Sequence, residues 1–171
     1  TEFHVNTTTA SGQSDPSITS LSASGVANGR FIVTWTDEYK DGSSSGIFGQ
    51  IYNVAGTSIS SVNSEFQINT TTPNHQRWSS VKELSNQNIL VVWTSDGQDG
   101  GSSSGTGNGG IFGQILNTMG AKVGSEFQIN TFTAGDQREP SIAVLSDGGF
   151  VVTWQSEGQD QGDGDSRTGA K

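Results

Sequence analysis

The amino-acid sequence predicts an all-β fold made of tandem four-stranded antiparallel blades, each about 60 residues long. Four short sequence blocks recur in a fixed order along the chain, which chance does not produce. Each block is either rich in β-branched and aromatic residues or alternates apolar with polar residues, as strands do. No segment carries a sustained apolar stripe with the 3.6-residue period of a helix, so we expect almost no helix.

We name the blocks A to D in the order in which they follow one another within a unit. Block A begins at Gln13, Gln76 and Gln137; block B ends at Trp35, Trp93 and Trp154; block C begins at Gly46 and Gly110; block D begins at Glu2, Glu65 and Glu126. The chain therefore reads D, ABCD, ABCD, AB. Length differences between units fall in Gly-, Ser-, Asn- and Asp-rich stretches, where surface loops tolerate insertions.

Each block predicts one strand, bounded by turn signals such as Asn28-Gly29 and Asp147-Gly148. The expected strands cover residues 2–6, 17–22, 31–36, 46–53, 64–69, 79–84, 89–94, 110–117, 125–130, 140–145 and 150–155. Alternation places Ile47 and Ile51 on one face of a C strand, with Phe48 and Tyr52 on the other. In block D it places Phe and Ile on a core face and Glu on the opposite face, where Glu65→Ala is expected to change little.

The block order divides the chain into an orphan D strand of a preceding repeat at 1–9, repeat 1 at 10–72, repeat 2 at 73–133 and a partial repeat 3, with strands A and B, at 134–171. Four antiparallel strands in about 60 residues is the size of one propeller blade. Three blades cannot close an ordinary propeller, which needs about four to eight. The expected architecture is therefore β-propeller-like or an open repeat array.

The blocks resemble a family of tandem repeats of the form GSEFQxNT, GDQxxPS, GGFVVTW and GIFGQ. The similarity is closest from Gly124 to Asp160, which reads GSEFQINTFTAGDQREPSIAVLSDGGFVVTWQSEGQD, and extends more loosely over the whole chain. Such repeats occur in very large secreted or cell-surface proteins, several of which also carry RTX-type calcium-binding repeats or adhesin-like modules. The resemblance implies an extracellular array of propeller-like blades and implies little about a ligand.

Composition and motifs exclude several classes of function. With 8 basic and 17 acidic residues the net charge is -9, which argues against binding to nucleic acid or to an anionic membrane surface. The absence of cysteine removes disulfides and thiolate sites. No nucleophile elbow follows a strand, and Gly105–Gly110 has neither the Lys nor the helix of a phosphate loop, so we expect no enzyme activity.

The loop after block B carries two recurring acidic positions, three and six residues beyond each Trp. They are Glu38 and Asp41, Asp96 and Asp99, and Glu157 and Asp160, with Asp163 and Asp165 added in the third copy. Ca²⁺ binds six to eight oxygen ligands on pliable, glycine-containing loops, so these residues are candidate Ca²⁺ ligands. The alternative is that the acids are turn residues and surface charge, because the EF-hand pattern is absent.

Two further candidates are surface sites. Trp78 stands where the other copies have Asp15 and Glu139, so we expect it to face solvent, either as a stacking platform for glycans or as a local packing substitution. Asn6 and Asn69 begin Asn-Thr-Thr glycosylation sequons, which would make the chain a glycoprotein; the alternative is an ordinary β-forming surface. His4 and His75 have no obvious partner in the sequence.

The function expected from these features is a non-enzymatic extracellular repeat module for structural assembly, as a surface or filament protein, or for adhesion. Its partners would be neighbouring repeats or identical subunits joined head-to-tail, without membrane insertion. We further expect residues 1–9 to pack against or complete the incomplete sheet of residues 140–154 in a neighbouring repeat or molecule. The alternative function is a carbohydrate-binding, propeller-type lectin that uses Trp78.

Overall fold

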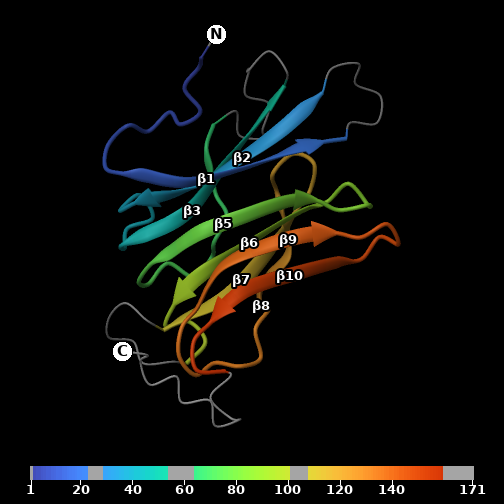
Figure 1. The fold of residues 1–171 in the computed structure, drawn as a ribbon. Coiled ribbons are helices and arrows are strands. Elements are labelled where there is room, and N and C mark those ends of the chain that lie inside the picture. The colour runs from blue at the N-terminus through green and yellow to red at the C-terminus, as the bar shows by residue number, and fades with distance from the viewer. Residues whose placement is uncertain (1, 23–28, 54–63, 101–107, 160–171) are drawn as a thin grey trace, which may run out of the picture.

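The chain was analysed as a computed structural model that describes residues 2–22, 29–53, 64–100 and 108–159. These residues contain ten strands and no helix, which confirms the all-β prediction (Figure 1). The strands are β1 (Gln13–Leu21), β2 (Arg30–Glu38), β3 (Ser45–Asn53), β4 (Phe66–Gln67), β5 (Gln76–Glu83), β6 (Ile89–Asp96), β7 (Gly109–Leu116), β8 (Lys122–Gln128), β9 (Gln137–Val144) and β10 (Phe150–Ser156). Within the described ranges, no helix could cross a membrane.

The strands form three antiparallel sheets in chain order. Sheet 1 has the order β1-β2-β3-β4, sheet 2 the order β5-β6-β7-β8, and sheet 3 pairs β9 with β10. Blocks A, B, C and D therefore occupy successive places in sheets 1 and 2, and blocks A and B pair in sheet 3, as the repeat predicted. In the described part of the chain the sheets close into neither a barrel nor a propeller.

The pairing register is the same in the two complete sheets. Trp35 lies opposite Phe48 in sheet 1, and Trp93 lies opposite Phe112 in sheet 2. The next C-strand position is a glycine in both. A Cβ added at Gly49 would lie 3.0 Å from Ile68 Cδ1 and 3.3 Å from the carbonyl oxygen of Val33, so glycine there allows block D to pack closely against the C strand.

Block A begins its strand three or four residues earlier than predicted, because each copy passes through a β-bulge. Two residues of the A strand, such as Asp15 and Pro16, lie opposite the single Trp of block B. The first bulge residue has a left-handed backbone in every copy, with φ of 52° at Asp15, 58° at Trp78 and 54° at Glu139. The bulge lets the strand continue through the segment that begins at the Gln of block A.

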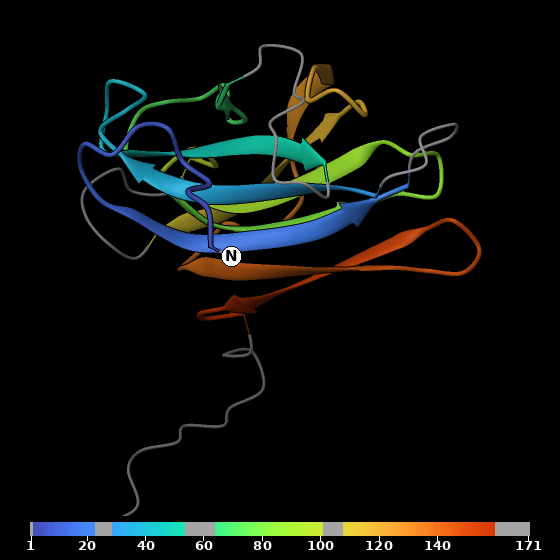
Figure 2. The ribbon, with the colours of Figure 1, turned by 90° about the horizontal axis from the view of Figure 1, so that it is seen from above.

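The three sheets stack face to face as successive layers, with β5 packed against both β1 and β9 (Figure 2). We call the face of a sheet that is turned toward the preceding sheet its leading face, and the opposite face its trailing face. The core between sheets 1 and 2 joins the trailing face of sheet 1 to the leading face of sheet 2. Its members are Leu21, Ile32, Ile47, Ile51, Ile68, Val81, Ile89, Val91, Trp93, Phe112 and Leu116.

The next layer repeats this arrangement. Leu90 and Val92 on the trailing face of sheet 2 pack with Ile142 and Val152 of sheet 3. On the leading face of sheet 1, Val33, Trp35, Phe48 and Tyr52 form a separate apolar cluster. The predicted separation of Ile47 and Ile51 from Phe48 and Tyr52 is thereby confirmed.

The prediction of a strand at residues 2–6 is wrong. These residues adopt no regular structure and lie across the leading face of sheet 1, where the rings of Phe3 and Tyr52 are 5.5 Å apart. The hydroxyl of Tyr52 donates a hydrogen bond to the carbonyl oxygen of Val5. In the sheets, block D is paired beside block C, and no C strand lies beside residues 2–6 in the described chain, which explains the missing strand.

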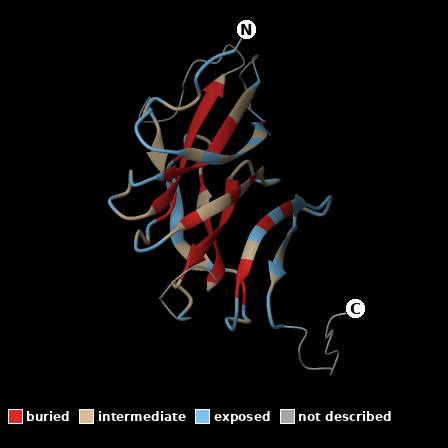
Figure 3. Cartoon of the chain, turned by 60° about the vertical axis from the view of Figure 1, so that its left-hand side comes forward, coloured by how far each residue is buried: buried red, intermediate tan, exposed pale blue. Residues whose placement is uncertain are grey.

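Burial decreases toward the third sheet. Trp35 and Trp93 are buried, with exposed fractions of 4% and 0%, whereas Trp154 is only half-buried. The prediction that all three Trp residues are mostly buried therefore holds for the two complete sheets. Figure 3 shows the same trend, with buried residues filling the central strands and exposed residues along the C-terminal strand pair.

We expect Trp93→Ala to destabilise the fold by about 3–5 kcal/mol, because it leaves a large cavity in a closed core. The equivalent Trp154→Ala should cost clearly less, since Trp154 is already partly in contact with water. Urea unfolding of the two variants and the unaltered chain measures both effects. Equal losses would contradict the assignment of the core.

The stability of the fold should depend on pH, because residues 2–6 lie over the side chain of Tyr52. Burial raises the pKa of Tyr52 from its ordinary 10.0 to about 12. Because the folded state holds this proton more tightly than the unfolded chain does, the stability contribution is complete below pH 10 and is lost as the pH rises toward 12. Deleting residues 2–9 should return the pKa toward its ordinary value, as followed by ultraviolet absorbance titration. An unchanged titration would show that residues 2–9 do not cover Tyr52 in solution.

Candidate functional site

The repeated polar residues concentrate in the connections that lead from one sheet to the next. In the connection from β4 to β5, the side-chain nitrogen of Asn69 donates to the carbonyl oxygen of Thr71 at 2.9 Å and to Oε1 of Gln76 at 3.1 Å. The side-chain nitrogen of Gln76 donates in turn to the carbonyl oxygen of Pro73 at 2.8 Å. We call this pair the Asn–Gln clasp.

The clasp occurs in all three copies. Asn6 with Gln13 and Asn130 with Gln137 repeat the same contacts, at 3.1 Å and 3.2 Å between the two side chains. In the complete sheets the Asn also accepts from the C strand: the Ile47 N–H donates to Asn69 at 2.9 Å, and the Ile111 N–H donates to Asn130 at 2.8 Å. The clasp therefore fixes both the shape of the connection and its attachment to the sheet that it leaves.

This geometry bears on the predicted glycosylation at Asn6 and Asn69. Asn69 is 1% exposed, and its Nδ2, the atom that a glycan would modify, already donates two hydrogen bonds. The folded chain therefore offers no access to that atom. Asn6 is half-buried and makes the equivalent bonds, so glycosylation there stays a prediction.

In the first two connections, the Glu of the following D block binds the backbone just after the clasp Asn. The Thr8 N–H donates to Glu65 at 2.9 Å, and the Thr70 and Thr71 N–H groups donate to Glu126. The expectation that Glu65 lies on a tolerant solvent face is wrong: its side chain is 3% exposed and forms an ion pair with Lys40. Burial lowers the pKa of Lys40, and the charge of Asp37 opposes that shift. The alternation of block D shows which side chains share a face of the strand. It does not show that the segment around Thr8 covers Glu65.

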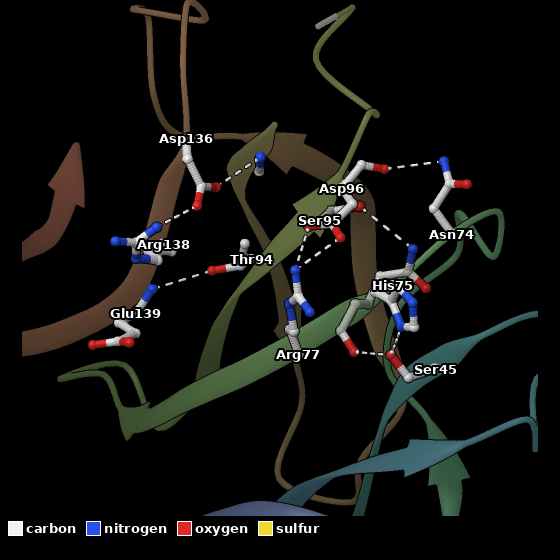
Figure 4. Close-up of polar contacts among 12 residues, drawn as sticks. Ser45, Asn74, His75, Arg77, Thr94, Ser95, Asp96, Asp136, Arg138 and Glu139 are labelled. Carbon is white, nitrogen blue, oxygen red and sulfur yellow. Dashed lines mark hydrogen bonds and ion pairs between the residues drawn. The ribbon is translucent and has the colours of Figure 1, made fainter. Parts of the chain in front are cut away.

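The first acidic position of each B-to-C loop is bound by the residue just before block A, as Figure 4 shows for Asp96 and His75. The Asp96 N–H donates to the carbonyl oxygen of His75 at 2.9 Å, and Glu38 and Glu157 make the equivalent bonds. Arg77 neutralises the Asp96 carboxylate at 2.9 Å. Burial raises the pKa of Asp96, and the Arg77 charge opposes this shift. In the third copy, Arg138 forms an ion pair with Glu157 at 2.9 Å.

The second acidic position lies over the C strand. A Cβ added at Gly46 would lie 2.8 Å from Asp41 Oδ2, and one added at Gly110 would lie 2.7 Å from Asp99 Oδ2. The glycines that open block C therefore leave room for these carboxylates. Asp41 Oδ1 accepts a hydrogen bond from its own turn, from the N–H of Ser43 at 3.0 Å.

The described residues do not bring the predicted calcium ligands together. No group of three or more Asp, Glu or His side chains in the described ranges is arranged to hold a metal ion. Asp160, Asp163 and Asp165 lie outside the described residues. Calcium binding by Glu38, Asp41, Asp96, Asp99 and Glu157 stays a prediction, and the ion pairs of Asp96 and Glu157 with arginine provide another role for two of these acids.

His75 is a structural residue that the sequence did not reveal. Its Nδ1 lies 3.1 Å from the hydroxyl oxygen of Ser45, where sheet 1 meets sheet 2. The equivalent contact between sheets 2 and 3 runs from the Gly109 N–H to Asp136 at 2.9 Å. Both residues directly precede the Gln of block A, so comparison of the copies at this position could have shown their shared role.

Trp78, the candidate ligand-binding residue, is half-buried rather than freely exposed. The Arg77 guanidinium lies 4.5 Å from the centroid of its ring, so one face of the indole is occupied by a cation–π contact. Trp78 is also one of the left-handed bulge residues. Trp78 is therefore packed against its own strand β5 rather than freely exposed to solvent.

Comparison with known proteins gives no assignment. The chain matches no family model, no curated protein and no solved structure.

We expect Asn69→Ala to destabilise the fold by about 2–4 kcal/mol, because it leaves buried hydrogen-bonding groups of Ile47 and Gln76 without partners. Asn6→Ala removes the equivalent clasp at a half-buried position and should cost less. Denaturant unfolding of both variants measures the difference, and a negligible effect of Asn69→Ala would show that the clasp is not structural.

The calcium prediction is tested by thermal unfolding. If the loop acids bind Ca²⁺ in the folded state alone, the melting temperature should rise with added Ca²⁺ and fall with a chelator. Mg²⁺ serves as the control for general charge screening. If metal-free protein keeps the same melting temperature with added Ca²⁺ and with chelator, the loop acids do not bind Ca²⁺.

Proposed function

We propose that the chain is a non-enzymatic structural repeat module whose sheets stack on further sheets of the same kind in an extracellular or cell-surface assembly. One observation carries the proposal: both outer faces of the stack expose side chains whose equivalents are buried between sheets. Stacking of like on like would bury them in the same way. In this reading the sheets are the blades of an open or propeller-like array.

The leading face of sheet 1 shows the first half of this pattern. Ile18 is 61% exposed, whereas its equivalents Val81 and Ile142 are 1% and 4% exposed. A pocket of about 150 Å³ lies beside it, lined by Val33, Trp35 and the clasp of Asn6 and Gln13, among others. The corresponding surface of sheet 2 is filled by the trailing face of sheet 1.

The trailing face of sheet 3 shows the other half. Val151 is 44% exposed, and its equivalents Ile32 and Leu90 are completely buried. Leu145 is 43% exposed, and its equivalent Leu21 is 5% exposed. The two outer faces thus carry the two halves of the interface that the chain already uses twice internally.

Two further features support this function. Polar contacts recur between the sheets: the hydroxyls of Thr34 and Ser79 are 2.9 Å apart, and the Glu139 N–H donates to Thr94 at 3.2 Å. The resemblance of the blocks to repeats of large secreted and cell-surface proteins supports an extracellular location. Nothing in the described ranges specifically favours the lectin alternative, since one face of the Trp78 ring is already occupied.

The proposal predicts reversible end-to-end self-association, measured by sedimentation equilibrium over a range of concentrations. Val151→Glu should weaken association by about tenfold or more, because it places a charge in the stacked face. Val123→Glu is the matched control, since Val123 is similarly exposed at 42% and lies on β8, outside both stacking faces. A chain that stays monomeric throughout, or equal weakening by both variants, would contradict stacking.

A further inference from the structure

In the described residues, one edge of β10 has no strand paired with it. Its equivalents β2 and β6 are central strands, each paired with an A strand on one side and a C strand on the other. Within the described ranges, β10 pairs with β9 alone. Its residues are exposed or half-buried, in the pattern that Figure 3 shows near the C-terminus, whereas all of β6 is buried. An open edge presents a row of backbone donors and acceptors to any strand that fits.

The two complete sheets define which strand fits. In both, the Trp of block B lies opposite the Phe of block C, and the residue before the Trp lies opposite a glycine. Transferred to β10, this register places Phe opposite Trp154 and Gly opposite Thr153. A strand of the Gly-Ile-Phe-Gly-Gln-Ile type could therefore pair with β10 in the register that it has with β2 and β6.

Side-chain space at the edge agrees with this register. An open hollow of about 430 Å³ runs along β10, lined by Val152, Thr153, Trp154, Ser156 and Gln159. In sheet 2 the equivalent Trp93 is completely buried, with Phe112 beside it at 5% exposure. The hollow beside Trp154 lies where the Phe of a C strand would pack.

We propose that the β10 edge is an acceptor site for one C-type strand of a further repeat, bound antiparallel with its Phe opposite Trp154. The two C strands of this chain are already central in their sheets, and residues 160–171 contain no such sequence. The proposed occupant is therefore a C-type strand of a further repeat. The inference names a partner for the proposed repeat module and rests on that function.

The expectation that residues 1–9 complete the sheet of residues 140–154 stays a prediction, and the same pairing rule proposes how they would do so. In both complete sheets block D pairs with block C and never with block B. By this rule the D block at residues 2–6 would pair with a C strand and not with the B strand β10. A C-type strand on β10 would instead offer its free edge to a D block.

The probe is a synthetic peptide with the sequence of residues 109–117, Gly-Gly-Ile-Phe-Gly-Gln-Ile-Leu-Asn, added to the intact chain. Binding should bury Trp154 and shift the tryptophan emission to shorter wavelength, and the Trp154→Phe chain should lose that shift. A scrambled peptide of the same composition is the control. No shift with the native peptide, or an equal shift with the scrambled one, overturns the proposal.

A disulfide-trapping measurement fixes the register and does not depend on fluorescence. The chain has no cysteine, so a Thr153→Cys chain carries a single thiol. A peptide with Cys in place of the glycine that corresponds to Gly113 should cross-link to it at least about tenfold faster than to a Val151→Cys chain, because only the first pair is directly opposite. Equal rates would overturn the register and with it the acceptor site.

Failure of this inference is distinguishable from failure of the proposed function. Leu145→Glu alters the stacking face but lies outside β10, so it should weaken self-association while peptide binding is retained. Self-association without peptide binding would refute the acceptor edge alone. Loss of peptide binding in the Leu145→Glu chain would show that the peptide occupies the stacking face, and this too would refute the acceptor edge.

Discussion

The structure depends on the packing of one sheet's trailing face against the next sheet's leading face. Both faces carry aliphatic side chains, and the leading face of sheet 2 adds the large rings of Trp93 and Phe112. Sheet 2 alone among the described sheets is covered on both faces by other sheets, and every residue of β6 is buried there. A four-stranded sheet of this length cannot bury its apolar surface alone, so stability must come from neighbours, as in other repeat proteins.

The polar residues of the connections make this stacking regular. Burying an amide or a carboxylate is unfavourable unless its hydrogen bonds are satisfied. Within each clasp, Asn and Gln bond to each other and to the backbone of the connection, and Glu65 and Glu126 accept from the N–H groups just after the Asn of the first two clasps. Every connection therefore has the same shape and delivers the next A strand to the same place.

The sequence was sufficient for the strand order, the fold class and the face assignment of β3, because β-branched residues, alternation and repetition all indicate the same arrangement. It was insufficient where a feature depends on tertiary contacts. At the bulge, Asp15, Trp78 and Glu139 have a left-handed backbone. The three residue types differ, so the sequence carries no shared signal for this conformation. Block D at residues 2–6 has the right pattern but lacks a C strand beside it in the described chain. The pairing of Asp96 with Arg77, and of His75 with Ser45, joins residues that carry no spacing motif.

Native-state hydrogen exchange of β2 and β6 tests the dependence on inter-sheet packing most directly. Both are central strands with backbone partners on two sides, but only β6 has sheets packed on both faces. The account predicts that the β6 amides exchange only through global unfolding, whereas the β2 amides also exchange through local opening at a lower free energy. Equal protection of β2 and β6, or greater protection of β2, would contradict it.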